Sequence, residues 1–184
     1  PALFSVTTSN GTGVVERFRA PGGAKFSEDT IGDIWVGPTG MLVDPNSAGT
    51  LRIVDCELGM FPDNGLYVSG SHGTVLVEGG TYKNSNVCSI RLQGHGSSIR
   101  GATVVVDEAV SGRSQRGIRL DEGSELGVYD TTITLTDPNG DAVRIRDGVE
   151  TARIENTTIT MRTTKQNRGI HITNDAGRIE IVNS

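Results

Sequence analysis

The segment IVDCEL at residues 53–58 decides the fold, because its pattern returns along the rest of the chain. The later copies are VEGGTY at 77–82, IRGATV at 99–104, VYDTTI at 128–133, IENTTI at 154–159 and IVNS at 181–184. Successive copies begin 24, 22, 29, 26 and 27 residues apart. A strand-and-turn pattern that recurs at a nearly constant interval is typical of repeat architectures.

The third position of this pattern predicts a bend in every repeat. It holds only residue types that tolerate a left-handed backbone or form Asx turns. These residues are Asp55, Gly79, Gly101, Asp130, Asn156 and Asn183.

A second pattern follows the first in each repeat and alternates apolar with variable residues. Its copies are GLYVSG at 65–70, SIRLQG at 89–94, GIRLDE at 117–122, AVRIRD at 142–147 and GIHITN at 169–174, preceded by an incomplete copy, DIWVG at 33–37. A period of two predicts a strand with one face inward and one face outward. A unit of this length cannot bury its apolar face alone, so it stacks on its neighbours.

These features predict an all-β fold, a right-handed parallel β-helix solenoid of about six rungs. The 25 glycines and the aromatic content of 4% agree with short strands joined by many turns. A leucine-rich repeat would require a Leu spacing that is absent, and a sandwich would show hairpin turns.

One domain is expected in a chain of 184 residues. Residues 31–184 carry the repeats and predict the parallel β-helix, whereas residues 1–30 predict an irregular coil or a cap over the N-terminal end of the stack. Cys56 and Cys88 show neither metal-ligand spacing nor a disulfide framework, so we expect two buried free thiols.

Charge and hydropathy argue against several classes of function. The net charge of −5 is spread along the chain, which disfavours nucleic acid as a partner and a polybasic membrane anchor. No apolar run approaches the roughly 18 residues of a membrane span, so we expect no membrane insertion. No signal peptide is visible in the sequence.

The outward positions of the second pattern predict a column of candidate ligand-binding residues. Stacking aligns the variable residue between the two apolar positions, about 4.8 Å from rung to rung. The residues of this column are Trp35, Tyr67, Arg91, Arg119, Arg144 and His171. Two positions later, the same face offers a second column, Ser69, Gln93, Asp121, Arg146 and Thr173, of which Asp121 and Arg146 are further candidates.

Three successive arginines in this column would repel one another unless an anion or neighbouring carboxylates balanced them. Guanidinium groups bind carboxylate or sulfate in bidentate fashion, and Trp35 and Tyr67 offer flat faces to sugar rings. The column therefore predicts a site for an acidic polysaccharide. The alternative is that the arginine stems cover apolar surface and pair with local carboxylates.

Calcium is the one metal that the acidic residues suggest. Asp121, Glu122, Asp147 and Asp175 all lie near the ends of strands of the second pattern. Calcium binds several such oxygens, but this spacing follows no metal loop, and turn chemistry accounts for the residues. We therefore expect no cofactor.

Residues 31–184 resemble the right-handed parallel β-helix repeat proteins of the pectate-lyase-like superfamily. Three phrases are most similar to the β-helix surface proteins of halophilic archaea, namely PDNGLYVS at 62–69, EGGTYKNSN at 78–86 and IRGATVVVDE at 99–108. This resemblance implies an extracellular or cell-surface location, and it implies no particular activity.

Several enzymes of this superfamily cut acidic polysaccharides. Gly94-His95-Gly96 and Arg144-Ile145-Arg146 are similar to two motifs of its polygalacturonase-like hydrolases. The aspartate pair that should precede Cys88 is replaced by Asn86-Val87, although inverting hydrolysis needs two positioned carboxylates. The lyases use calcium and an Arg or Lys base, and nothing in the sequence marks an arginine that could accept a proton.

We therefore expect a non-catalytic, surface-type β-helix protein that binds an acidic polysaccharide or surface glycan. One alternative is a polysaccharide lyase or glycoside hydrolase of pectate-lyase-like type. Another is a structural repeat module that self-associates through the ends of the β-helix. The fold does not choose among them, because functional sites are grafted onto folds.

Overall fold

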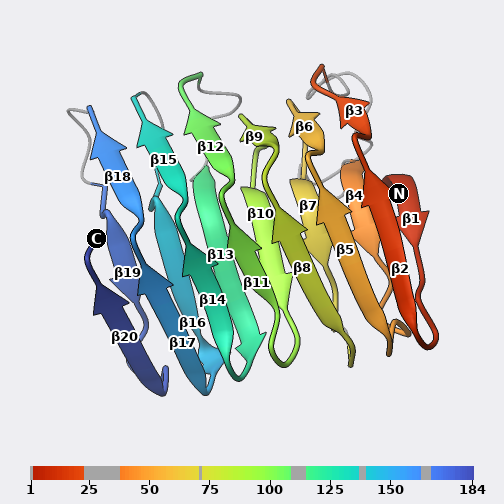
Figure 1. Ribbon diagram of the computed structural model, residues 1–184. Coiled ribbons are helices and arrows are strands. Elements are labelled where there is room, and N and C mark those ends of the chain that lie inside the picture. The colour runs from red at the N-terminus through yellow and green to blue at the C-terminus, as the bar shows by residue number, and fades with distance from the viewer. Residues whose placement is uncertain (1, 23–37, 71, 109–114, 137–139, 163–166) are drawn as a thin grey trace.

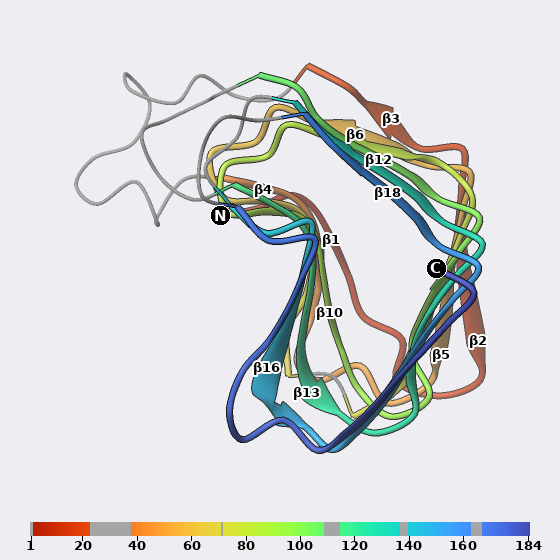
Figure 2. The ribbon, with the colours of Figure 1, turned by 90° about the vertical axis from the view of Figure 1, so that its left-hand side faces the viewer.

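The computed structural model describes residues 2–22, 38–70, 72–108, 115–136, 140–162 and 167–184. The regular structure in these ranges is all β-strand, and the strands form three parallel sheets that run along a solenoid (Figure 1). Viewed along the stack, successive turns follow nearly the same outline (Figure 2). The predicted all-β parallel β-helix is therefore confirmed.

Sheet A carries the second sequence pattern and forms the inward-curved side of the outline in Figure 2. Its seven strands are, in order across the sheet, β1 (Ala2–Val6), β4 (Thr39–Val43), β7 (Asn64–Val68), β10 (Cys88–Gln93), β13 (Arg116–Gly123), β16 (Val143–Val149) and β19 (Ile170–Ile172). Neighbouring strands pair in parallel, so equivalent residues of successive repeats lie side by side.

Sheets B and C carry the first sequence pattern, with the predicted bend between them. The strands of sheet B are β2 (Thr12–Glu16), β5 (Thr50–Val54), β8 (Thr74–Glu78), β11 (Ser98–Arg100), β14 (Leu126–Tyr129), β17 (Thr151–Glu155) and β20 (Arg178–Val182). The strands of sheet C are β3 (Arg19–Ala20), β6 (Glu57–Gly59), β9 (Thr81–Lys83), β12 (Thr103–Val106), β15 (Thr132–Leu135) and β18 (Thr158–Met161).

The bend has the left-handed backbone that the sequence predicts. The six predicted residues have φ values of 47° at Asp55, 67° at Gly79, 66° at Gly101, 50° at Asp130, 50° at Asn156 and 48° at Asn183. The parallel ladder continues through the bend, because the backbone N–H of Asp130 donates to the carbonyl of Glu155 in the next turn at 3.0 Å.

Aliphatic side chains stack in register inside the solenoid. One inward column of sheet B consists of Ile53, Val77, Ile99, Val128 and Ile154, each 0% exposed. Burial of one such side chain contributes about 1.5–3 kcal/mol. Cys56 and Cys88 are also buried, as expected, and they are free thiols. Burial raises the pKa of Cys88 to about 12.

The N-terminal segment is more regular than the irregular coil or cap expected for residues 1–30. Within its described part, β1, β2 and β3 pair with β4, β5 and β6 as a first turn of the solenoid. Arg17 takes the bend position with a φ of 52°, and no Gly, Asp or Asn marks that position in the sequence. Phe4 and Phe18 stack with ring centroids 5.2 Å apart and pack against the core.

Candidate functional site

The outer face of sheet A brings most of the predicted column together. Register pairs connect Tyr67 with Arg91, Arg91 with Arg119, Arg119 with Arg144, and Arg144 with His171. All five side chains are half-buried on this face.

The sixth member of the predicted column, Trp35, lies outside the described residues. In the turn before Tyr67, the equivalent register position is occupied by Leu42 of β4. The described column therefore offers one aromatic side chain rather than two.

Asp121 binds two of the stacked arginines at once. Its carboxylate accepts a hydrogen bond from Arg91 Nε at 2.5 Å and another from Arg119 Nε. The Asp121 side chain is only 6% exposed, so the three groups form a partly desolvated cluster. Arg91 also stacks on Tyr67, with Cζ 4.3 Å from the ring centroid. In this part of the column, a neighbouring carboxylate, that of Asp121, therefore reduces the repulsion between Arg91 and Arg119.

Arg144 differs from these arginines because no described carboxylate pairs with it. Its Nε is buried and has no hydrogen-bond partner among the described residues. Burial lowers the pKa of the nearby Arg116, and the charges of Arg144 and Arg119 lower that pKa further, whereas Cys88 and Asp141 act in the opposite direction. The centre of the column therefore brings the positive charges of Arg116, Arg119 and Arg144 close together.

His171, the last residue of the column, is hydrogen-bonded to a buried aspartate that the sequence analysis did not identify as a candidate. Asp141, with its side chain 5% exposed, accepts hydrogen bonds from His171 Nδ1 at 3.0 Å and from Arg168 Nε at 2.9 Å. Asp141 and Arg168 each directly precede a copy of the second pattern, at the position that Asn64, Cys88 and Arg116 hold in the earlier turns. The pattern as predicted starts one residue too late to include them.

β-Bulges interrupt the register of the predicted second column. Gln93 lies opposite Glu122 rather than Asp121, so Asp121 is an extra residue in β13. In the next strand, β16, Ile145 pairs with Leu120 and Gly148 pairs with Glu122. The two residues between Ile145 and Gly148, Arg146 and Asp147, are therefore both extra relative to β10. Extra residues in a strand re-aim the side chains around them.

The bulges build a shallow depression beside the column. It has a volume of about 300 Å³ and is lined by Arg91, Gln93, Arg119, Asp121, Glu122, Arg146, Asp147 and Gly148. A second depression of about 240 Å³ adjoins it through the shared residues Gln93 and Glu122. The first lining contains three arginines and three acidic residues, so its charges balance.

The remaining ionic contacts on this face are local. Arg146 Nε donates to Asp147 at 3.1 Å, and this contact holds the pKa of Asp147 below its usual value.

Among the described residues, no group of three or more His, Cys, Asp or Glu side chains could hold a metal ion. Within the same ranges, no helix has the length and apolar character needed to span a membrane.

No family model, curated protein or solved structure matches this chain. The structure itself places the chain among parallel β-solenoid proteins. The pectate-lyase-like resemblance, the surface location and the ligand remain predictions.

Proposed function

We propose that this chain is a non-catalytic, surface-type β-helix protein whose sheet A face binds an extended acidic polysaccharide. The observation that carries the proposal is Arg144, in the centre of a register-aligned column, whose buried Nε has no hydrogen-bond partner and whose guanidinium pairs with no carboxylate among the described residues. A half-buried cation that no carboxylate of the described ranges neutralises favours an external anion, and guanidinium groups bind carboxylate or sulfate with two parallel hydrogen bonds.

The rest of the column suits the uncharged parts of a polysaccharide. Arg91 and Arg119 share Asp121 as a counter-ion, which fixes their orientation and leaves other N–H groups for sugar hydroxyls. From Tyr67 to His171 the column crosses four strand spacings, or about 19 Å. This length accommodates several sugar units in a row, with one acidic group at Arg144.

The first test is retention on a panel of uronate, sulfated and neutral polymers, with and without calcium. We expect binding to one acidic class and at least about tenfold weaker binding by Arg144→Ala, because a charged hydrogen bond contributes about 1.5–3 kcal/mol. Arg144→Lys should retain part of the affinity, since it keeps the charge without the planar fork.

Arg52→Ala is the matched control. It also removes one arginine from a strand face, but Arg52 lies on sheet B and pairs with Glu78 at 2.6 Å. Equal loss in both variants would indicate a general charge effect, and undiminished binding by Arg144→Ala would exclude the proposed site. The recovered polymer should be intact; a new ultraviolet absorbance from unsaturated uronates would instead identify a lyase.

A further inference from the structure

A pocket of about 300 Å³ lies on sheet B, away from the arginine column of sheet A. It is lined by Glu125, Leu126, Tyr129, Thr151, Ala152, Arg153, Arg178 and Glu180, from strands β14, β17 and β20 and from the turn before β14. This volume is at the lower end of the roughly 300–1,000 Å³ found for small-molecule sites. It therefore suits one small ring rather than an extended chain.

Gly127, in the outward column of sheet B, makes room for the ring of Tyr129, which lines the pocket. Register pairs place Gly127 between Ser98 and Arg153, so the glycine leaves a gap in the row of side chains. The ring of Tyr129 lies over Gly127, close enough that a Cβ atom there would collide with it. The aromatic ring is therefore held against the sheet by the absence of a side chain at residue 127.

Arg100, on the neighbouring strand β11, covers the ring of Tyr129, and the pocket lies on the opposite side of the ring, toward β17. Arg100 of β11 places its Cζ 4.4 Å from the ring centroid, and Asp130 holds that guanidinium with an ion pair of 2.7 Å. The pocket residues come from β14, β17 and β20, and β17 is the neighbour of β14 on the side opposite β11. An aromatic ring fixed in this way offers a rigid stacking surface.

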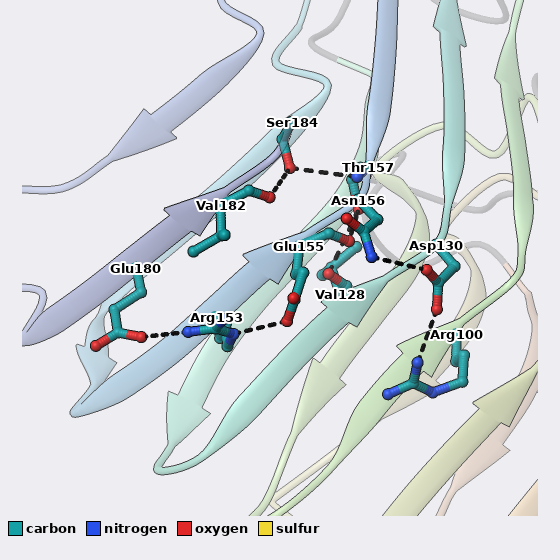
Figure 3. Close-up of polar contacts among 10 residues, drawn as sticks. All are labelled: Arg100, Val128, Asp130, Arg153, Glu155, Asn156, Thr157, Glu180, Val182 and Ser184. Carbon is teal, nitrogen blue, oxygen red and sulfur yellow. Dashed lines mark hydrogen bonds and ion pairs between the residues drawn. The ribbon is translucent and has the colours of Figure 1, made fainter.

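The polar wall of the pocket is a pre-arranged network. Arg153 donates from Nε to Glu155 at 2.8 Å and from Nη1 to Glu180 at 2.6 Å (Figure 3). Arg178 Nη2 donates to the other oxygen of Glu180 at 2.5 Å. The hydrogen bonds from Arg153 hold the pKa of Glu155 and of Glu180 below their usual values, so both carboxylates stay ionised as acceptors.

The charges that line the pocket balance, which distinguishes it from the centre of the column on sheet A. Two glutamates, Glu125 and Glu180, face two arginines, Arg153 and Arg178. A charged ligand would disturb the existing ion pairs. A neutral molecule with several hydroxyl groups can instead accept from guanidinium N–H groups and donate to carboxylate oxygens.

We propose that this pocket binds a single neutral sugar ring, stacked on Tyr129 and hydrogen-bonded by Arg153 and Glu180. The ring can belong to a free monosaccharide or to the terminal unit of a glycan, because both present the same face and hydroxyls. This site does not depend on polysaccharide binding by sheet A.

The test is saturation-transfer NMR on the whole chain with a panel of neutral methyl hexopyranosides and short neutral oligosaccharides. We expect a signal from at least one sugar. Tyr129→Ala should weaken its binding about tenfold, in line with the loss of an aromatic contact. Tyr129→Phe should bind as the wild type does, because it keeps the ring. Signals from methyl glycosides would identify a monosaccharide site, and signals confined to the ends of oligosaccharides would identify a terminal-unit site.

Arg153→Met provides a second variant in case Tyr129→Ala fails to fold. It removes the hydrogen-bond donors and keeps an apolar stem, so it should also weaken binding about tenfold. Arg52→Met is its matched control, because Arg52 is likewise an outward residue of sheet B paired with a glutamate and lies outside the pocket. The absence of a signal from every neutral sugar, or unchanged binding by folded Tyr129→Ala and Arg153→Met, would overturn the proposal.

Discussion

A left-handed residue follows the described strands of sheet B and turns the chain toward sheet C. Asp130 and Asn156 show how such residues also connect successive turns. The amide of Asn156 donates to the Asp130 carboxylate at 3.3 Å, and that carboxylate binds Arg100 in the preceding turn (Figure 3). The backbone conformation and the side-chain ladder thus favour the same residue types, Asn and Asp.

Asn156→Val should destabilise the chain by about 1–2 kcal/mol, because a left-handed conformation brings a Cβ branch too close to the following carbonyl oxygen. Asn156→Gly should be nearly neutral, since glycine adopts this conformation freely and the lost hydrogen bond is exposed. Thr158→Val, at an exposed strand position in the same turn, is the control and should change stability by less than about 0.5 kcal/mol. Urea denaturation measures all three, and equal costs for the two valine variants would contradict the backbone argument.

At the scale of strands, the sequence predicted the sheets but not their irregularities. The alternation in GIRLDE and AVRIRD correctly predicted that Arg119 and Arg144 lie in register. It could not predict the extra residues Asp121, Arg146 and Asp147, because an extra residue is defined by comparison with the paired strand, and the pattern of a single strand does not show that pairing. The bulges are nevertheless what shapes the depression beside the column.

Gly148 should be essential to the bulged pairing of β13 and β16. A Cβ at Gly148 would lie 2.7 Å from the carbonyl oxygen of Asp121 and 3.2 Å from Glu122 Cβ. Because the carbonyl belongs to the ladder and cannot easily move, Gly148→Ala should cost about 1–3 kcal/mol. Gly22→Ala, where no atom of the described residues lies within 4 Å of the added Cβ, should be tolerated. Comparable melting temperatures for both variants would show that the bulge can relax around a methyl group.

At the scale of the whole molecule, the solenoid carries two candidate binding sites on different faces, the arginine column on sheet A and the pocket on sheet B, and their charge patterns differ. The ion pairs that define these faces join residues far apart in sequence, such as Arg91 with Asp121 and Arg153 with Glu180. The interval between repeats varies between 22 and 29 residues, so no fixed spacing marks such partners in the sequence. The repeat predicted the column, and only the three-dimensional stack shows that Arg144 lacks a carboxylate partner in the described part of the chain and that a further pocket exists on sheet B.

Stability in such a stack should depend on position along the axis, because each turn contacts only its neighbours. Ile154 and Ile181 are adjacent in one inward column, yet Ile154 is 0% exposed and Ile181 is 47% exposed. Ile154→Ala should therefore cost about 2–5 kcal/mol in the free energy of unfolding, whereas Ile181→Ala should cost less than half as much. Urea titration of the two variants, followed by circular dichroism, gives both values. If Ile181→Ala cost as much as Ile154→Ala, the last turn would have to be covered in solution, and sedimentation at increasing concentration would then show whether a second copy covers it.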